Sequence, residues 1–521
     1  MADGDRALMG ADALVRTLAD CGVDACFANP GTSEMHLVTA LDREPRIRSV
    51  LCLFEGVATG AADGYARVAG KPAMTLLHLG PGYLNGAANL HDARRAFSPV
   101  INVVGDHATY HRHLDAPLTS DIEGLTAPLS AWTGVVMNEG EAGAKAAEAF
   151  AASYGPPRGN AFLLLPADSA WNEGGVMAKA LKGAELQRAA DETIASVAEA
   201  IRKAKKPSLL VNGDALYEPG LSALGRIAAA GVLVHADTFS PRLARGAGRY
   251  APPKLPYFAE QAVDALAGVD LLVTAGTKHP VAFFAYPGKP SELTPENATR
   301  ASLGGPEIQV ADALLRLADA LGASAQGALT PVQTHPDAVS EPLGPWQIGA
   351  SLARHMPEHA ILCDDAVSSG QPIAMATAGG PQHEWLGHTG GAIGQGMPMA
   401  VGAAVAAAGK RKVIALCGDG AAMYTNQALW SLAREKLDCT VIVFANRSYR
   451  ILNIELARTG AGNPGPTAAS MLSLDNPAID WVKLAEAQGV QAVRCNDALD
   501  FDRQLARLLA IKGPTLIEAV I

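Results

Sequence analysis

Residues 412–420 read Lys-Val-Ile-Ala-Leu-Cys-Gly-Asp-Gly, an apolar run that ends in a tight turn. The apolar part predicts a strand over Val413–Leu416, and we expect a helix next, over Thr425–Lys436. A second strand is predicted over Thr440–Phe444, followed by Ala-Asn-Arg-Ser-Tyr at residues 445–449. A strand, a crossover helix and a second strand form the repeating unit of a parallel α/β sheet.

Asp419 and Asn446 come at the ends of these two predicted strands. Because parallel strands end at the same edge of a sheet, we expect the two side chains to lie near each other, where α/β sheets bind ligands. Carboxylate, amide and main-chain oxygens suit Mg²⁺, and Gly418 and Gly420 let main-chain N–H groups approach a diphosphate. The tripeptide alone is typical of an ordinary turn. The preceding strand and the asparagine at the next strand end favour a ligand site.

The composition is that of a globular protein with large buried surfaces. Of 521 residues, 49% are hydrophobic and 18% are charged, which is below the usual value of about 25%. This balance excludes a disordered chain and suggests burial between subunits as well as in cores. The formal net charge is −10, and no basic run is present, so nucleic acid is not expected as a partner.

Residues 390–409 form an uncharged stretch that requires a membrane test. The stretch consists mainly of Gly and Ala, and Gln395 and Pro398 interrupt it. A buried loop that continues into a packed helix is therefore a better interpretation than a bilayer span. The first six residues show neither a basic region nor an apolar region, so we expect a cytoplasmic protein without membrane contact.

Short apolar runs alternate with helix-length segments along the whole chain, which predicts an α/β fold. Two polar stretches interrupt this alternation, at residues 183–193 and in the Pro/Gly/Gln/Thr-rich segment 325–345. We therefore expect three doubly wound parallel-sheet domains, over residues 1–182, 190–325 and 345–521.

The Gly-Asp-Gly turn, its spacer and Asn446 resemble the cofactor motif of the thiamine diphosphate enzymes in the acetolactate synthase, pyruvate oxidase and benzoylformate decarboxylase group. The resemblance implies thiamine diphosphate and Mg²⁺ as cofactors, with the metal ion bound by Asp419, Asn446 and the carbonyl of Ser448. Relatives commonly have Asn-Asn where this chain has Ala445-Asn446, but their metal ligand is the second asparagine. The cofactor is then expected to contact Gly418, Asp419, Gly420, Ala421, Asn446, Ser448 and Tyr449.

The N-terminal unit contains Leu51-Cys-Leu-Phe-Glu55, an apolar run followed by a helix-length segment. A glutamate at a helix start is by itself typical of a cap. The stretch resembles the segment that bears the family's catalytic glutamate, so Glu55 is expected to hydrogen-bond the aminopyrimidine of the cofactor and promote loss of the thiazolium proton. Family geometry places this glutamate across a subunit interface from the Gly-Asp-Gly unit. The resemblance thus implies a homo-oligomer, a dimer at least and a tetramer in many relatives.

The same resemblance implies that the three units are, in chain order, a pyrimidine-binding domain, a Rossmann-like middle domain and a diphosphate-binding domain. In the third unit, the Gly-rich run from His388 to Pro398 matches the segment beneath the cofactor. The carbonyl of Gly391 is expected to accept a hydrogen bond from the 4′-amino group, and Ile393 to hold the cofactor bent. Ser368 and Ser369 open a predicted helix and are candidates for the phosphate cradle, although such serines are usually only caps.

Two features bear on the substrate. Asn29-Pro-Gly-Thr32 resembles a turn of benzoylformate decarboxylase with a hydroxyl residue at the position of Thr32. Thr75-Leu-Leu-His78 resembles the segment in which that enzyme carries a catalytic histidine, which can transfer protons to and from intermediates. Acetolactate synthases typically lack this histidine. A lone histidine at a strand end is more often structural, but its match to the family position favours catalysis by His78.

Other histidines give weaker signals. The decarboxylase's second histidine, from the middle domain, is not evident, and His279 could replace it only if that loop folds differently. We interpret His107, His111 and His113 as part of a solvated loop.

The middle unit gives no sign of a flavin site. Acetolactate synthases bind FAD there with an Arg-Phe-Asp-Asp-type stretch, and residues 274–279, Thr-Ala-Gly-Thr-Lys-His, do not match it. FAD is therefore not expected. Residues 210–215, Leu-Val-Asn-Gly-Asp-Ala, also lack the Gly-x-Gly-x-x-Gly turn that a nicotinamide oxidoreductase would need.

The sequence therefore predicts a non-oxidative 2-oxo acid decarboxylase with carboligase capacity, of the benzoylformate decarboxylase type. The alternative within the family is an FAD-independent acetolactate synthase, in which a second pyruvate captures the intermediate. A catalytically inactive homologue is a third option, and the intact Glu55, Asp419 and Asn446 argue against it.

Overall fold

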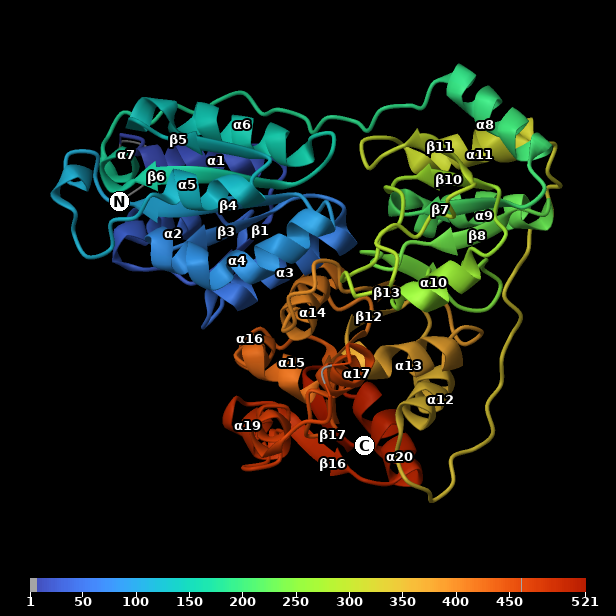
Figure 1. Cartoon of the computed structure of the whole chain (residues 1–521). Helices are drawn as coiled ribbons and strands as arrows, with labels where there is room; N and C mark the ends of the chain where they lie inside the picture. The colour runs from blue at the N-terminus through green and yellow to red at the C-terminus, as the bar shows by residue number, and fades with distance from the viewer. Residues whose placement is uncertain (1–6, 461) are drawn as a thin grey trace.

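Three sheets with flanking helices follow one another along the chain (Figure 1). The computed structural model describes residues 7–460 and 462–521. In Figure 1 the first unit lies at the upper left, the second at the upper right and the third below them. The sheets have six, four and seven strands, and their strands are parallel except for one edge strand. The expected α/β fold with three parallel sheets is thus confirmed.

The first sheet has the strand order β2-β1-β3-β4-β6-β5. Its strands are β1 (Ala25–Ala28), β2 (Arg48–Leu51), β3 (Ala73–Leu77), β4 (Val100–Asp106), β5 (Trp132–Val135) and β6 (Asn160–Pro166). Its helices are α1 (Gly10–Cys21), α2 (Met35–Asp42), α3 (Glu55–Ala69), α4 (Leu79–Arg95), α5 (Ile122–Thr126), α6 (Ala142–Tyr154) and α7 (Ala167–Trp171). Because β2 and β3 lie on opposite sides of β1, the strand order reverses at the carboxyl ends of β1 and β3, where open α/β sheets bind ligands.

The second sheet has the order β11-β10-β7-β8. Its strands are β7 (Pro207–Val211), β8 (Leu233–Ala236), β10 (Leu271–Ala275) and β11 (Thr299–Gly304). Its helices are α8 (Asp191–Lys203), α9 (Gly220–Ala229), α10 (Ala259–Ala265) and α11 (Val310–Ala320).

The third sheet has the order β16-β17-β15-β14-β12-β13-β9. Its strands are β9 (Leu243–Arg245), β12 (Ala360–Asp365), β13 (His383–Leu386), β14 (Val413–Gly418), β15 (Cys439–Ala445), β16 (Gln491–Cys495) and β17 (Thr515–Val520). Its helices are α12 (Pro345–His355), α13 (Gly370–Ala376), α14 (Gly396–Ala407), α15 (Asp419–Tyr424), α16 (Ala428–Arg434), α17 (Arg450–Arg458), α18 (Pro466–Met471), α19 (Trp481–Ala487) and α20 (Ala498–Leu509). Here the strand order reverses between β12 and β14.

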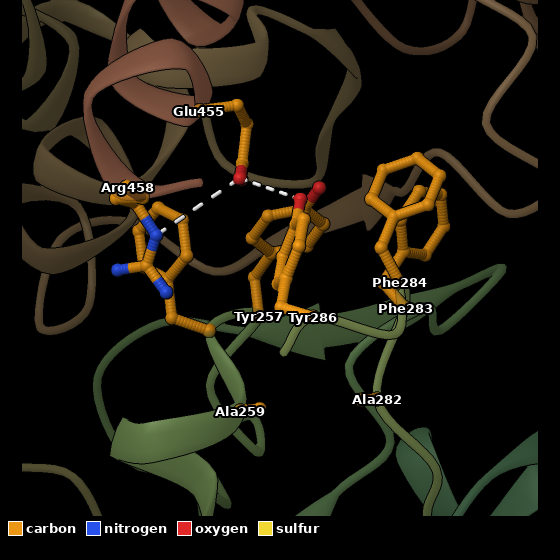
Figure 2. A pocket seen from close by; sticks show the side chains of 9 residues that line it. Tyr257, Ala259, Ala282, Phe283, Phe284, Tyr286, Glu455 and Arg458 are labelled. Atoms are coloured by element: carbon orange, nitrogen blue, oxygen red, sulfur yellow. Dashed lines mark hydrogen bonds and ion pairs between the residues drawn. The ribbon is translucent and has the colours of Figure 1, made fainter. Parts of the chain in front are cut away.

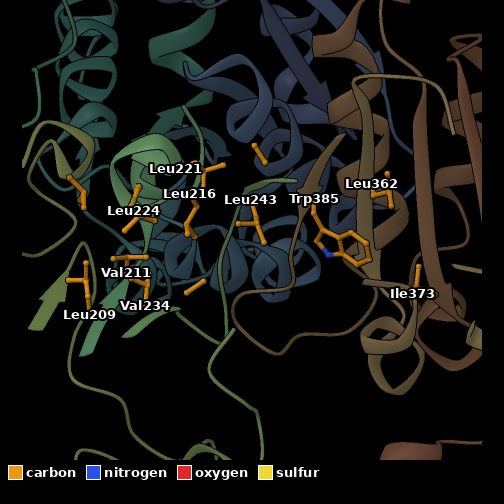
Figure 3. Close-up of a cluster of buried hydrophobic side chains, with 14 of the residues drawn as sticks. Leu209, Val211, Leu216, Leu221, Leu224, Val234, Leu243, Leu362, Ile373 and Trp385 are labelled. Atoms are coloured by element: carbon orange, nitrogen blue, oxygen red, sulfur yellow. The ribbon is translucent and has the colours of Figure 1, made fainter. Parts of the chain in front are cut away.

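Strand β9 joins the second unit to the third. It comes from the segment after β8 and pairs antiparallel with β13, with Leu243 opposite Trp385. Figure 3 shows the apolar cluster that continues across this junction, from Val211 and Leu224 on one side to Leu362 and Ile373 on the other. The sequence did not predict that a strand of the middle segment pairs with the third sheet, because a strand of three residues is too short to show a periodicity.

The first and third units meet where α3 crosses α14 (Figure 1). Glycines allow this close approach: a Cβ atom at Gly402 would lie 1.8 Å from the carbonyl oxygen of Ala61, and one at Gly64 would lie 2.1 Å from that of Met399. The uncharged stretch 390–409 therefore forms a loop and a packed helix, as predicted. None of the helices in the described part of the chain has the length and apolar character of a membrane span.

The helix expected over Thr425–Lys436 is present but shorter, as α16 (Ala428–Arg434). A second short helix, α15, which was not predicted, precedes it and begins at Asp419 itself. The break falls at Thr425, whose hydroxyl donates a 2.6 Å hydrogen bond to the carbonyl oxygen of Gly394. A contact with a residue distant in sequence thus ends α15.

Candidate active site

Asp419 and Asn446 lie in adjoining loops at the carboxyl ends of β14 and β15, as their spacing predicts. The buried Asp419 carboxylate accepts hydrogen bonds from the main-chain N–H groups of Gly420, at 2.9 Å, and Arg447, at 2.6 Å. The Asn446 Oδ1 atom accepts a hydrogen bond of 2.9 Å from the N–H of Ser448. The structure thus joins the two loops through Asp419, at the edge where the order of the third sheet reverses.

The chemistry of this loop cluster fits a small divalent cation. Burial raises the pKa of Asp419, while the hydrogen bonds from Arg447 and Gly420 act in the opposite direction. A cation would stabilise the ionised carboxylate at this buried position. A carboxylate, an amide oxygen and the nearby carbonyl of Ser448 are the oxygen donors that Mg²⁺ prefers.

The Gly420 position leaves little room for a side chain. A Cβ atom there would lie 2.5 Å from Cε1 of the Tyr449 ring. The ring of Tyr449 therefore packs directly against the Gly-Asp-Gly turn, next to the buried Ala421. Ser368 and the buried Ser369 follow β12 in a short 3₁₀ helix, Val367–Ser369, at the same reversal point of the sheet.

The Gly-rich loop beside this turn is fixed by carboxylates that sequence reasoning missed. Asp365 Oδ2 accepts hydrogen bonds from the N–H groups of Gly394, at 2.8 Å, and Gly396, at 3.1 Å. Asp92, on α4 of the first unit, accepts from the N–H of Ala392 at 3.2 Å. Burial raises the pKa of Asp365 to about 7 and that of Asp92 to about 8.

These anchors hold a loop that contains two of the predicted cofactor contacts. Gly391 is exposed and has a φ of +86°, which glycine adopts without strain. Ile393 is half-buried in the same loop. No local pattern points to Asp92, because it lies some 300 positions away from Ala392 in sequence.

A second group of polar side chains lies at the reversal point of the first sheet. Glu55 is the first residue of α3; it is 7% exposed, and Asn85 Nδ2 donates a hydrogen bond of 3.0 Å to its Oε2 atom. His78 follows β3, and its Nδ1 atom lies 2.8 Å from Oε2 of Glu34 and 3.2 Å from the Ser33 hydroxyl. The ring passes close to the main chain: a Cβ atom at Gly31 would lie 2.3 Å from its Cγ atom.

The structure favours the neighbours of Thr32 over Thr32 itself. Thr32 is exposed, whereas Ser33 donates a hydrogen bond of 2.7 Å to Glu34 Oε1 and contacts His78. Glu34 is fully buried and accepts a further hydrogen bond of 2.8 Å from the N–H of Gly31. The sequence signal that could have identified Glu34 is a carboxylate placed between a glycine turn and an apolar helix.

Backbone strain marks the same segments. Non-glycine residues with positive φ directly adjoin predicted site residues: Leu79, with φ 49°, follows His78, and Val367, with φ 49°, precedes Ser368. Arg447, with φ 53°, separates Asn446 from Ser448. Each costs on the order of 1–3 kcal/mol, and such strain concentrates at functional sites.

A small pocket lies between the second and third units (Figure 2). The segment after β10 contributes Phe283, Phe284 and Tyr286 to it, and α17 contributes Glu455 and Arg458. Sequence reasoning did not identify this pocket. His279, at the start of the same segment, is not among its lining residues, and burial lowers the pKa of its ring.

The Glu55 group and the Asp419 group belong to different units of the chain. Across residues 7–460 and 462–521, no hydrogen bond or ion pair joins the two groups. His107 and His111 lie close together, with ring centroids 5.3 Å apart, on the loop after β4.

The sequence models of two families match this chain. The N-terminal TPP-binding domain of thiamine pyrophosphate enzymes matches residues 8–126, and the C-terminal TPP-binding domain matches residues 370–519. The chain therefore belongs to the thiamine diphosphate enzyme family and is an enzyme of this kind. The resemblance inferred from the Gly-Asp-Gly motif is thus confirmed.

Individual relatives cover almost the whole chain. A Mycobacterium tuberculosis protein, provisionally named acetolactate synthase large subunit IlvX, is 48% identical over 98% of this chain and 99% of its own length. The benzoylformate decarboxylase of Pseudomonas aeruginosa is 28% identical over 95% of this chain and 96% of its own length. The thiamine diphosphate-dependent 4-hydroxybenzoylformate decarboxylase of Rhodococcus jostii RHA1 has the same fold, with a TM-score of 0.85, 24% identity and 98% coverage of both chains.

Proposed function

We propose that this chain is a thiamine diphosphate- and Mg²⁺-dependent, non-oxidative 2-oxo acid decarboxylase with carboligase capacity, of the benzoylformate decarboxylase type. The observation that carries the proposal is the pairing of His78 with Glu34 at the reversal point of the first sheet. Similarity to a benzoylformate decarboxylase over 95% of the chain supports it. The proposed domains are 1–182, 190–325 and 345–521.

The residues at the two sheet edges fit the cofactor. Asp419, Asn446 and the carbonyl of Ser448 would bind Mg²⁺, and the turn from Gly418 to Ala421 would adjoin the diphosphate, with Tyr449, Ser368 and Ser369 beside it. Gly391 and Ile393 would lie against the thiamine rings, and Glu55 would hydrogen-bond the aminopyrimidine. When bound, the cofactor supplies an electron sink for the electron pair released with CO₂.

The overall reaction requires a proton donor. A 2-oxo acid anion and one proton give an aldehyde and CO₂, so a proton must be delivered to the former carbonyl carbon. Because the Nδ1 atom of His78 contacts the buried Glu34 carboxylate, Nε2 is the nitrogen left to exchange a proton with a substrate. His78 is therefore the proposed acid and base.

A dimer is the proposed minimal active species. The resemblance to the family implies that Glu55 lies across a subunit interface from the Gly-Asp-Gly turn, so two chains would contribute one group each to every active site. Relatives with this arrangement are commonly tetramers, and we propose a tetramer for this chain as well.

The middle unit supports function without FAD. Its sheet reverses order between β7 and β10, which is where a dinucleotide would bind. The side chain of Val310 packs beside this point: a Cβ atom at Gly276 would lie 2.8 Å from its Cγ2 atom. Asp214 Oδ1 accepts a hydrogen bond of 3.0 Å from the N–H of Ala311, so the start of α11 is already capped by a carboxylate of the chain itself.

An acetolactate synthase without FAD is the second candidate. It is favoured by the 48% identity to the provisionally named acetolactate synthase large subunit of M. tuberculosis. In that reaction, two pyruvate anions and one proton would give acetolactate and CO₂. A second pyruvate, rather than a proton, would then capture the intermediate.

Proton NMR of the products separates the two candidates. The enzyme is supplied with thiamine diphosphate and Mg²⁺, and then with pyruvate or benzoylformate in separate samples. Aldehyde formation from either acid is expected. Acetolactate from pyruvate, with benzoylformate unchanged, would favour the synthase instead.

A further inference from the structure

We propose that Asp365 and His388 are positioning residues for the cofactor: the protonated carboxyl group of Asp365 donates a hydrogen bond to the His388 ring, and this ring holds the carbonyl of Gly391 in place. The inference rests on the proposed function, because the Gly391 carbonyl is the proposed acceptor for the 4′-amino group of the cofactor. It adds two side chains that were not among the expected cofactor contacts.

The two side chains face each other with unsatisfied polar atoms. Asp365 is the last residue of β12, and His388 follows the neighbouring strand β13 by two residues. The Nδ1 atom of His388 lies 3.7 Å from Oδ1 of Asp365. Across residues 7–460 and 462–521, these two buried atoms have no hydrogen-bond partner, and neither has Nε2 of His388. Buried polar atoms are normally paired, so three such atoms on two facing side chains require an explanation.

A single proton is enough to pair the first two atoms. Their separation exceeds the usual upper limit for a hydrogen bond, about 3.2 Å, by only about 0.5 Å, which a small rotation of the imidazole ring closes. A proton on Oδ1 of Asp365 is then donated to Nδ1 of His388. The neutral ring carries its own hydrogen on Nε2, where it can act as a donor.

The surroundings favour this neutral pair over an ion pair. Burial raises the pKa of Asp365 to about 7, and the neighbouring Asp364 carboxylate acts in the same direction. Burial and the charge of Arg67 lower the pKa of His388 to about 4, although Asp364 and Asp63 act in the opposite direction. The proton therefore belongs to the carboxyl group rather than to the imidazole ring.

The other oxygen of Asp365 holds the far side of the same loop. Oδ2 accepts hydrogen bonds from the N–H groups of Gly394, at 2.8 Å, and Gly396, at 3.1 Å. A proton on Oδ1 leaves Oδ2 free to accept both bonds. One carboxyl group thus fixes the loop after Gly391 and the ring of His388 before it.

Arg67 on α3 fixes the main chain on both sides of His388. It donates hydrogen bonds to the carbonyl oxygen of Gly387, at 2.6 Å, and to the hydroxyl of Thr389, at 3.1 Å. The guanidinium group is itself held by Asp63 in a buried ion pair of 2.7 Å. The His388 ring is therefore attached to a rigid part of the loop.

The carbonyl of Gly391 can serve the ring and the cofactor together. In the part of the chain that the structure describes, no main-chain N–H group donates to this carbonyl. The main chain of Gly391 lies near enough to the His388 ring to act on its pKa, in the direction opposite to burial. Because a carbonyl oxygen has two lone pairs, it can accept from Nε2–H of the ring and from an amino group of the cofactor. Successive hydrogen bonds in a buried chain also strengthen one another.

The experiment compares the wild type with Asp365→Asn, Asp365→Ala and His388→Phe in calorimetric titrations with thiamine diphosphate in the presence of Mg²⁺. Asparagine keeps both roles, because its oxygen can accept from the loop and its amide N–H can donate to His388. We therefore expect the Kd of Asp365→Asn to stay within about threefold of the wild type. Asp365→Ala and His388→Phe should bind about tenfold more weakly, the usual cost of removing a supporting contact. His113→Phe, at an exposed position, is the control.

Proton exchange at C2 of the thiazolium ring gives a second readout. It is followed by proton NMR in D₂O on the loaded enzyme without substrate. Exchange should slow by about tenfold in His388→Phe, because the aminopyrimidine is less well oriented, and kcat should fall while KM changes less than about threefold. Wild-type binding and exchange in His388→Phe would overturn the inference. A loss in Asp365→Asn of tenfold or more in either readout would also overturn it, and this variant decides the point even if Asp365→Ala fails to fold.

Both readouts are independent of the substrate, which separates this inference from the proposed function. If the holoenzyme decarboxylates no 2-oxo acid but His388→Phe weakens cofactor binding and slows exchange, the proposed function fails and the role of His388 stands. If the holoenzyme decarboxylates 2-oxo acids and His388→Phe matches the wild type in both readouts, the role of His388 fails alone.

Discussion

The Oε2 atom of Glu34 lies 2.8 Å from Nδ1 of His78. Glu34 is fully buried, whereas the His78 side chain is 21% exposed, so the histidine connects a buried carboxylate to the open edge of the first sheet. This arrangement fixes the ring orientation and leaves Nε2 free for proton exchange.

Replacing His78 by Ala should remove the proposed proton donor. We expect kcat for decarboxylation to fall by about 10²–10⁴-fold, the usual contribution of general acid–base catalysis, with unchanged cofactor binding. Steady-state kinetics and a calorimetric titration with thiamine diphosphate measure the two quantities. A loss of less than about threefold would remove the main support for the decarboxylase assignment.

Glu34→Gln tests the positioning role of the carboxylate. The substitution keeps the shape of the side chain but replaces the carboxylate oxygen beside Nδ1 by a neutral amide, which holds the ring less firmly. We expect kcat for decarboxylation to fall by about tenfold with little change in KM, because the proposed proton donor is less well oriented. Glu123→Gln, at an exposed position on α5, is the control and should leave kcat unchanged. Wild-type kcat in Glu34→Gln would contradict a positioning role for Glu34.

Glu55→Gln should separate cofactor binding from cofactor activation. The amide can still accept the hydrogen bond from Asn85, so the fold around α3 is expected to persist. We predict retained binding of thiamine diphosphate and a loss of activity of about a hundredfold or more, because an amide cannot exchange a proton with the aminopyrimidine. Wild-type turnover by this variant would contradict the role assigned to Glu55.

Asp419→Ala should abolish the stabilisation that the cofactor provides. Ligand at about a hundred times its Kd stabilises the folded state by about 2.7 kcal/mol, which a thermal melt detects. The wild type should therefore melt at a higher temperature with thiamine diphosphate and Mg²⁺, and a chelator should reduce the increase. Asp42→Ala, at the exposed end of α2, should respond like the wild type. An equal increase in Asp419→Ala would exclude Asp419 as a metal ligand.

Asp92 should make stability depend on pH. Burial raises its pKa to about 8, from 3.8. The folded chain thus keeps a proton that the unfolded chain releases, so stability falls as pH rises between these values and levels off above about pH 8. In Asp92→Asn, the decrease in melting temperature from about pH 5 to pH 8 should be smaller than in the wild type. Asp115→Asn, at an exposed position, should retain the wild-type slope, and an equal slope in Asp92→Asn would contradict the prediction.

Local sequence patterns were enough to predict most elements and the motifs at their ends. Strands β14 and β15 include the predicted ranges Val413–Leu416 and Thr440–Phe444, and Asp419 and Asn446 were expected to come together. These features depend on local information, since apolar periodicity defines a strand and the residue after it lies at a known edge of the sheet. The end of α15 at Thr425 was missed, because the Thr425 hydroxyl donates its hydrogen bond to the carbonyl oxygen of Gly394, which lies far away in sequence.

Contacts between residues that are far apart in the chain depended on the tertiary structure. The contacts of Glu34 with His78, Asp92 with Ala392 and Phe283 with Gly391 join residues that are far apart in the chain. No periodicity or spacing encodes such pairs, because each depends on how helices and loops pack once the sheets have formed. The motifs at strand ends were therefore sufficient to predict the family. The pairing of Glu34 with His78 and the aromatic pocket between the second and third units could be found only from the packed structure.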